Sequence, residues 1–215
     1  MPDARTEILA RVRTAHAGRP GEPVAAETAI PRDYRHVLAG EPDRAALVAL
    51  ATDRISHYKA TVHHTDAGQL AASITAILHA RSVHQMVAPA DLPESWRTAG
   101  ITWHIDHPHA PLSTAELDAV DGVLTGCAAA IAETGTIVLD AGPTQGRRVL
   151  TLLPDYHLCV LNDHQIVGSV PEAIERLSPA RPLTFISGPS ATSDIEFHRV
   201  EGVHGPRTLD VLIVS

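Results

Sequence analysis

The chain of 215 residues is long enough for one large domain, or for one domain with a small helical appendage. Apolar residues make up 44% of it and aromatic residues only 3%, so we expect a core of Ala, Val, Leu and Ile. The formal net charge of −8 argues against nucleic acid and against an anionic membrane surface as partners, because both attract basic faces. No apolar run reaches the ~18 residues of a membrane span, and no apolar signal segment is visible. These features predict a cytoplasmic protein.

The N-terminal part of the chain differs in character from the rest. Residues 3–17 place Ile8, Leu9 and Val12 on one face and predict a helix that ends at Gly18. Residues 19–42 are rich in Gly, Pro and Glu and are typical of a linker. We therefore expect residues 1–42 to form a helical appendage with a linker, and residues 43–215 to form the main domain.

From Asp43, a helix N-cap, the pattern alternates between helices and strands. The expected order is a helix from residue 44, strand 61–65, helix 70–79, strand 83–88, a short helix at Trp96, strand 101–105, helix 114–120, strand 122–127, an Ala-rich helical turn, strand 136–140, strand 157–161, a helix from Pro171, and strands 183–187 and 209–214. This alternation predicts an α/β fold with a mostly parallel sheet that helices cover on both faces. In such sheets, ligands bind beyond the carboxyl ends of the strands.

Polar residues gather in two stretches that interrupt the apolar pattern. Glu133 lies in Ala132-Glu-Thr-Gly-Thr136, where its carboxylate can act as a nucleophile or a general base, or can simply bind loop amides. Ser187-Gly-Pro-Ser-Ala-Thr-Ser-Asp-Ile-Glu196 is followed by Gly202-Val-His-Gly-Pro206, so two Gly-Pro turns lie between apolar strands. Loops of this kind commonly carry function.

Three residues of these two stretches are catalytic candidates. Asp194 is either an acid–base group paired with Glu196 or a capping residue. His204, between Val203 and Gly205, is either a proton shuttle or a loop histidine bound to a carbonyl. With Glu133 they make up the predicted catalytic set. The candidate substrate-binding residues are Thr134, Gly135, Thr136, Arg148, Gly188, Ser190, Thr192, Glu196 and Gly205.

Other chemical motifs are weaker. The turn from Gly142 to Arg148 carries two arginines and either holds an anion or is an exposed hairpin turn. His63, His64, His104, His107 and His109 lack the spacing of a zinc site, so we expect surface histidines and no metal. Cys127 and Cys159 are expected to be small buried residues, since two thiols cannot ligate an ordinary iron–sulfur cluster. There is no G-x-G-x-x-G fingerprint either, so we expect no cofactor in this chain.

The segments around Glu133, from Arg147 to Pro154, from Ser187 to Glu196 and from Gly202 to Pro206 resemble the lactate utilization protein C family, whose members carry a LUD domain. The resemblance implies the three-layer α/β/α fold of ribose-5-phosphate isomerase and coenzyme A transferases. It also implies a part in the oxidation of L-lactate to pyruvate together with iron–sulfur partner proteins. The family usually has Arg after Gly-Pro-Ser, where this chain has Ala191.

The resemblance leaves the role of the chain open. It is either a lactate-oxidation subunit that binds a small carboxylate or acyl ligand and relies on partners for electron transfer, or a stand-alone acyl- or CoA-transfer enzyme that uses Glu133 as the nucleophile. A third alternative is a non-catalytic assembly subunit. Whether the chain is itself an enzyme therefore stays open at this stage.

Overall fold

The structure is a computed structural model that describes residues 3–17, 33–40, 42–192, 200–201 and 205–215. It divides into two units, Met1–Tyr34 and Arg35–Ser215. The first unit contains helix α1 (Ala4–Ala17), where the sequence predicts it. The second unit begins before Asp43, because residues 35–40 contact the main domain through contacts given below. The boundary at residue 42 stays a prediction.

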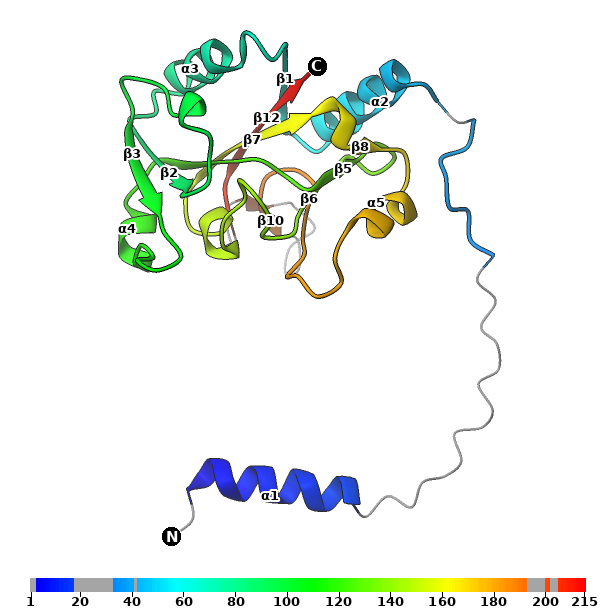
Figure 1. Cartoon of the computed structure of the whole chain (residues 1–215), viewed down its shortest axis with the longest axis vertical. Helices are drawn as coiled ribbons and strands as arrows, with labels where there is room; N and C mark the ends of the chain where they lie inside the picture. Colours follow the sequence, from blue (N-terminus) through cyan, green and yellow to red (C-terminus); the bar gives the residue numbers. More distant parts are fainter. Residues whose placement is uncertain (1–2, 18–32, 41, 193–199, 202–204) are drawn as a thin grey trace. The chain divides into compact units, whose positions relative to one another are not determined.

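The second unit is built on a sheet of six parallel strands (Figure 1). The strands are β1 (Thr61–Thr65), β2 (Gln85–Pro89), β3 (Thr102–Asp106), β4 (Gly122–Thr125), β7 (Tyr156–Asn162) and β12 (Thr208–Val214). Their order across the sheet is β1-β12-β7-β4-β2-β3, and every neighbouring pair is parallel. The α/β fold class predicted from the sequence is confirmed.

Helices pack on both faces of this main sheet, as in a three-layer α/β/α sandwich. They are α2 (Arg44–His57), α3 (Leu70–Ala80), α4 (Thr114–Asp118) and, beside a second sheet, α5 (Val170–Arg176). Side chains alternate along β7, so Leu158 packs with α3 on one face and Cys159 packs with α2 on the other. Helix α2 begins where Asp43 accepts a hydrogen bond from the backbone N–H of Ala46 at 2.8 Å, which confirms Asp43 as its cap.

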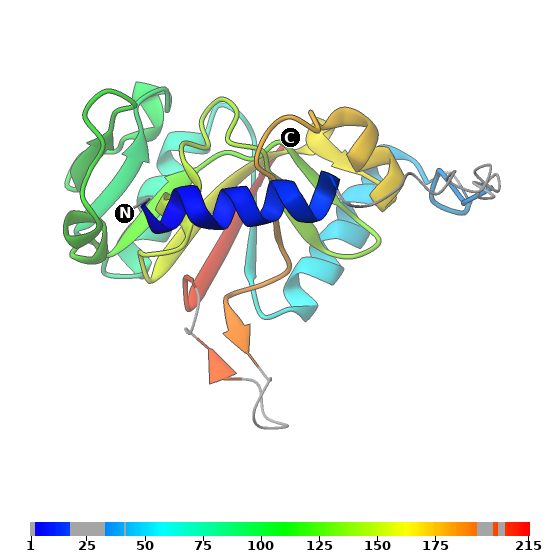
Figure 2. The ribbon, with the colours of Figure 1, turned by 90° about the horizontal axis from the view of Figure 1, so that it is seen from below.

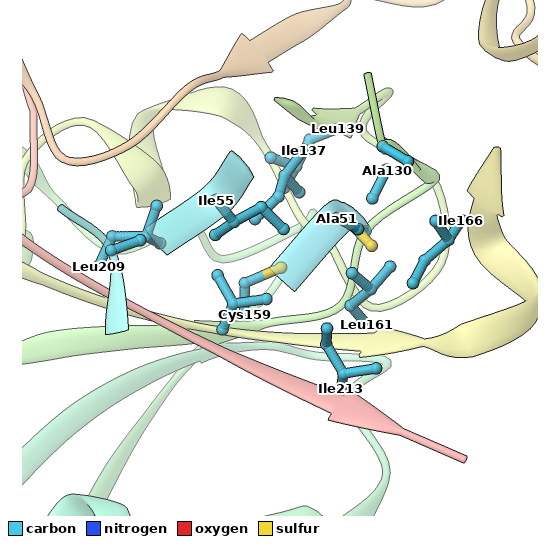
Figure 3. Packing of buried hydrophobic residues seen from close by; sticks show 14 residues of the cluster. Ala51, Ile55, Ala130, Ile137, Leu139, Cys159, Leu161, Ile166, Leu209 and Ile213 are labelled. Carbon is cyan, nitrogen blue, oxygen red and sulfur yellow. The ribbon is translucent and has the colours of Figure 1, made fainter. Parts of the chain in front are cut away.

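Two sequence expectations about strands are wrong. The Ala-rich segment is strand β5 (Ala129–Ile131), and strand 183–187 leaves the main sheet as β9 (Thr184–Ile186). Both belong to a second, mixed sheet of order β8-β5-β6-β9, with β6 (Thr136–Leu139) and β8 (Ile166–Val167). Figure 3 shows the reason: Ala130 and Ile137 of this sheet bury their side chains against Ala51 and Ile55 of α2. Tertiary packing outweighs the helix propensity of alanine.

Short elements complete the second unit. They are the 3-10 helices η1 (Glu94–Trp96), η2 (Arg148–Thr151) and η3 (Asp163–Gln165), and the antiparallel pair β10 (Ala191–Thr192) and β11 (Val200–Glu201). In Figure 2, β10 and β11 (orange) lie near the end at which β12 (red) begins. Among the described residues, no helix combines the length and the apolar character needed to cross a bilayer.

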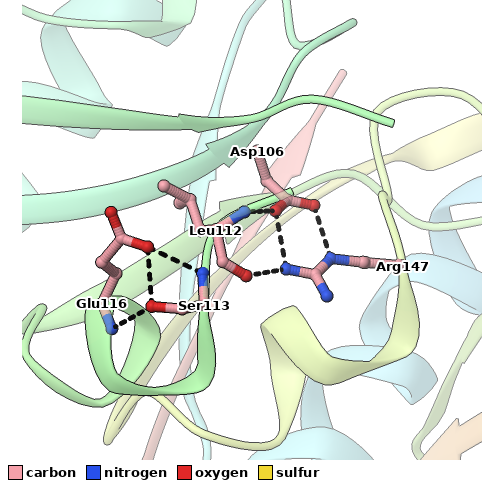
Figure 4. A network of polar contacts seen from close by, with 5 residues as sticks. All are labelled: Asp106, Leu112, Ser113, Glu116 and Arg147. Atoms are coloured by element: carbon pink, nitrogen blue, oxygen red, sulfur yellow. Dashed lines mark hydrogen bonds and ion pairs between the residues drawn. The ribbon is translucent and has the colours of Figure 1, made fainter. Parts of the chain in front are cut away.

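The loop 140–147 covers the carboxyl end of β4. The backbone N–H of Gly126, just after β4, donates to the carbonyl of Thr144 at 2.9 Å. Arg147 anchors the loop with two hydrogen bonds to Asp106, of 2.9 and 2.8 Å, and Asp106 also accepts from Leu112 N–H (Figure 4). Asp106 is buried, so this paired guanidinium neutralises a charge at the end of β3. One arginine of the turn from Gly142 to Arg148 is therefore structural.

At the opposite ends of the strands, Asp210 of β12 is fully buried. Arg81, which follows α3, forms two hydrogen bonds with its carboxylate, of 3.0 and 2.6 Å. The hydroxyl of Tyr156 on β7 donates to the same carboxylate at 3.0 Å. These contacts join the end of α3 to the adjacent strands β7 and β12 and supply the partners that a buried charge requires.

We predict that Arg81→Gln lowers the free energy of unfolding by about 3–5 kcal/mol, because it leaves the buried carboxylate of Asp210 without its cation. Arg207→Gln is the matched control, since Arg207 pairs with Asp155 in solvent and such a pair contributes about 1 kcal/mol or less. Urea unfolding of both variants measures the difference. Equal losses in the two variants would contradict a special role for the Asp210 cluster.

Candidate functional site

Glu133 lies two residues beyond the carboxyl end of β5. Its backbone N–H donates to the carbonyl of Gly168 at 3.1 Å, as a continuation of the pairing between β5 and β8. Its side chain is 35% exposed and forms an ion pair with Arg35. The carboxylate thus meets a cation from another segment, which neither sequence interpretation of Glu133 included. Its catalytic role stays a prediction.

The segment that carries Arg35 is fixed to the second sheet. The backbone N–H of Leu38 donates to the carboxylate of Glu172 at 3.1 Å, and the hydroxyl of Ser169 donates to the carbonyl of His36 at 2.7 Å. Glu172 also accepts from Gly168 and Ser169, so burial and these hydrogen bonds act in opposite senses, and the net pKa of Glu172 is lowered. Residues 36 and 38 are thus bound to Ser169 and Glu172 at the start of α5, and these contacts hold Arg35 beside Glu133.

Hydroxyl groups connect the loop after β5 to the end of β9. The Thr134 and Thr136 hydroxyls lie 2.8 Å apart, and the Thr136 hydroxyl lies 2.9 Å from that of Ser187. This contact follows from the register, because Ile137 of β6 pairs with Ile186 of β9. Two predicted substrate-binding residues thereby reach the Gly-Pro turn that follows β9.

Gly135 has a structural reason to be glycine. Its φ is +60°, and a Cβ atom there would lie 2.6 Å from the carbonyl oxygen of Arg54 in α2. Gly188, with φ +81°, approaches the carbonyl of Tyr58 at the end of the same helix in the same way. The close neighbour of Gly135 is thus helix α2, and its place among the substrate-binding residues stays a prediction.

A cavity of about 320 Å³ opens beside the Gly-Pro turn, and we call it the Arg148 pocket. Its polar lining residues are Arg148, Thr151, His157, Thr184, Ser187 and Ser190. Its remaining lining residues are Leu152, Phe185, Ile186, Gly188, Pro189, Gly205, Pro206 and Leu209. The volume is in the range of small-molecule sites, and convergent polar groups on an apolar wall are typical of them.

The Arg148 pocket lies at the amino-terminal ends of the central strands. His157 is the second residue of β7, and Leu209 is the second residue of β12. This pocket therefore does not lie beyond the carboxyl ends of the main sheet, and the site expected there stays a prediction. At that edge the loop 140–147 covers β4, while the side chain of Gln165 in η3 binds the carbonyl of Cys127 at 2.6 Å.

Arg148 is exposed at the pocket and differs from its neighbour Arg147. Within the part of the chain that the structure describes, its guanidinium makes no hydrogen bond or ion pair. The arginines that line two other large cavities are paired: Arg81 with Asp210 and Arg207 with Asp155 in one, and Arg147 with Asp106 in the other. The Arg148 pocket therefore offers a cation to an anionic ligand.

His157 is a site residue that the sequence interpretation missed. It lies in an apolar strand, is only 1% exposed, and still lines the pocket. Its Nε2 atom lies 2.8 Å from the hydroxyl of Thr125 on β4. Burial lowers the pKa of His157 to about 4, so the imidazole is neutral at physiological pH. The available signal in the sequence was a histidine inside a strand that is otherwise mostly apolar.

The remaining predicted residues divide into three groups. Arg148, Gly188, Ser190 and Gly205 line one pocket, whereas Glu133, Thr134, Gly135 and Thr136 are not among its lining residues. Asp194, Glu196 and His204 lie outside the described residues, as does the side chain of Thr192. Among the described His, Cys, Asp and Glu side chains, no group of three or more could hold a metal ion. The assignment of these residues to a site stays a prediction.

Comparison with known proteins identifies the family. A family model of the LUD domain matches residues 48–214. The chain belongs to the LUD domain family. Lactate utilization protein C of Deinococcus radiodurans is 44% identical over 217 residues, which cover 99% of this chain and 96% of that protein. The protein of the same name from Geobacillus kaustophilus is 32% identical over 136 residues, covering 58% and 55% of the two chains.

A solved structure extends the likeness to the fold. The crystal structure of a DUF162 family protein from Deinococcus radiodurans superposes with a TM-score of 0.70 at 43% sequence identity, over 81% of this chain and 99% of that one. The family resemblance seen in the sequence is confirmed. The relation of this LUD domain to coenzyme A transferases stays a prediction.

We predict that His157 makes the LUD domain sensitive to acid. The unfolded chain protonates this side chain near pH 6.5, but the folded chain does so only near pH 4, so the unfolded state gains protons first as the pH falls. The stabilisation is complete above pH 6.5 and is lost between about pH 6.5 and 4, by about 3 kcal/mol. Urea unfolding at pH 7.5 and 4.5 measures it, and His157→Gln should lose about 2–3 kcal/mol less than the unchanged chain over that interval. Equal losses of stability in the unchanged chain and in His157→Gln would show that His157 is not the source of the acid sensitivity.

We also predict that Gly135→Ala destabilises the domain more than Gly100→Ala, by about 1–3 kcal/mol. Both glycines have positive φ, but a Cβ at Gly100 meets nothing within 4 Å, whereas one at Gly135 meets the backbone of α2. The difference in thermal or urea unfolding isolates the clash from the strain of a left-handed backbone. Similar losses of stability in the two variants would show that the close approach to α2 is not what requires glycine at position 135.

Proposed function

We propose that this LUD domain acts in lactate utilization, as a subunit whose Arg148 pocket binds the carboxylate of a small organic acid. The observation that carries the proposal is an unpaired guanidinium at a pocket lined with hydroxyl groups. The names of the relatives from Deinococcus radiodurans and Geobacillus kaustophilus support lactate as the acid. An arginine forms two parallel hydrogen bonds with a carboxylate, which makes it well suited to such a ligand.

The hydroxyl groups fit the same ligand. Thr184 and Ser187 line the pocket and can donate hydrogen bonds to a carboxylate or hydroxyl oxygen, whereas the hydroxyl of Thr151 donates to the carbonyl of Arg148. The pocket is also larger than a three-carbon acid, so space remains at its mouth. Leu152 and Phe185 at this position are 37% and 48% exposed, and exposed apolar side chains beside a site often mark where another molecule approaches.

We propose that partner proteins with iron–sulfur clusters accept the electrons when lactate is oxidised to pyruvate. The chain has two cysteines, Cys127 and Cys159, and both are free thiols in the core. A hydrogen bond to Cys159 and burial both raise the pKa of the Cys127 thiol, which disfavours the thiolate that a cluster requires. Free thiols also fit the reducing cytoplasm, which is the location we propose.

The acyl- or CoA-transfer alternative has weaker support. A nucleophilic carboxylate has to face the bound acyl group. Glu133 pairs instead with Arg35 and is not among the residues that line the Arg148 pocket. A role for Glu133 in transfer would require this ion pair to open.

We predict that Arg148→Gln weakens the binding of L-lactate at least tenfold, because it removes a charge-assisted pair worth about 1.5–3 kcal/mol. Isothermal titration calorimetry on the purified chain measures the dissociation constant. Arg176→Gln is the matched control, since Arg176 is an exposed arginine of α5 that does not line the pocket. A pocket that takes up no lactate, or an Arg148 variant that binds it as well as the control does, would exclude the proposed ligand site.

A further inference from the structure

Two polar groups of different chemistry meet in the Arg148 pocket. Arg148 is a cation exposed at the pocket, and His157 is a buried imidazole in its wall. We infer that His157 contacts the substituent on carbon 2 of the bound acid, so that the pocket selects 2-hydroxy and 2-oxo acids over unsubstituted acids. This inference rests on the proposed function and adds to it a residue that determines specificity.

The imidazole is held from one side only. Thr125, which is fully buried on β4, lies 2.8 Å from Nε2 and fixes the plane of the ring. The second ring nitrogen, Nδ1, has no hydrogen-bond partner in the described part of the chain. It is also not one of the fully buried side-chain atoms that lack a partner, so it is not completely enclosed. Because His157 lines the pocket, a ligand atom placed there can supply the missing hydrogen bond.

The contact with Thr125 lets one ring serve two ligands. If the threonine hydroxyl accepts from Nε2–H, Nδ1 is an acceptor and takes a hydrogen bond from the hydroxyl of a 2-hydroxy acid. If the hydroxyl turns and donates to Nε2, Nδ1 carries the proton and donates to the oxygen of a 2-oxo acid. Rotation of one hydroxyl therefore matches the pocket to either member of a 2-hydroxy and 2-oxo acid pair.

The neutral state of the ring separates the tasks of the two residues. A charged imidazolium would attract any carboxylate and would add to the affinity for all acids alike. Burial keeps His157 neutral above about pH 5, so charge recognition is left to Arg148. An acid without a polar group on carbon 2 leaves Nδ1 unpaired, which costs the free energy of one hydrogen bond.

The experiment compares L-lactate, pyruvate and propionate by calorimetry with the purified full chain at pH 7.5. We expect lactate and pyruvate to bind about fivefold or more tightly than propionate, the scale of one net hydrogen bond. His157→Phe should reduce this ratio to within about twofold. Arg148→Gln should weaken all three acids by a similar factor.

The outcomes separate the inference from the proposed function. If the acids bind through Arg148 but His157→Phe keeps the preference, only the inference fails. A wild-type chain that binds all three acids equally also overturns it. If none of them binds, the proposed ligand site fails and the inference with it. If His157→Phe does not fold, the double variant Thr125→Val/His157→Phe replaces it, because it also removes the threonine hydroxyl that would be left unpaired. The same result is expected of it, a preference for lactate and pyruvate over propionate of about twofold or less.

Discussion

The loop 140–147 closes the carboxyl end of β4, and the contacts that hold it use most of the charged side chains at that edge. Arg147 holds the loop through Asp106, and Arg181 holds it through a 2.9 Å ion pair with Asp140. Gln145 completes the closure, because its side chain binds both the backbone N–H and the carboxylate of Asp140. The charges at this edge are thereby used for folding, whereas the guanidinium of Arg148, which has no partner among the described residues, lies at the amino-terminal ends of β7 and β12.

A cavity of about 380 Å³ does remain at the carboxyl ends of β2 and β3, where open α/β sheets usually bind ligands. Its lining residues Asp106 and Arg147 are paired with each other, and Asp91 accepts a hydrogen bond from the backbone of Thr144. A ligand there would have to break contacts that hold the loop. The Arg148 pocket makes no such demand, and this is why we favour it.

The sequence predicts those parts of the fold that local patterns specify. The cap at Asp43, the strands β1 and β7 and the helix α3 are predicted within a few residues, since caps and apolar periodicity are local properties. The second sheet escapes prediction for a physical reason. Strand β5 is extended because it pairs with β6 and β8 and packs against α2. These partners are distant in the sequence, so residues 128–132 alone do not predict the strand.

The candidate site shows the same division. The motif around Ser187 and Ser190 identifies one wall of the pocket from sequence alone, because Gly-Pro turns between strands are locally readable. Glu133 stands out in the same way, but its pairing with Arg35 joins residues 98 positions apart and leaves no mark in either segment. His157 is hidden for the opposite reason: an apolar strand gives a buried histidine the signature of a core residue.

Arg147 and Arg148 are adjacent in the sequence, but one arginine holds a loop and the other lines a pocket. The 3-10 helix η2 begins at Arg148, so the chain turns between the two residues and their side chains serve different regions. Arg147 is bound by a buried carboxylate, while Arg148 faces hydroxyl groups and a neutral histidine, none of which can neutralise it. A cation in such surroundings gains most from a ligand that brings the negative charge itself. The electrostatics of the pocket therefore favour an anion, and in the function that we propose the uncharged groups around Arg148 select among anions.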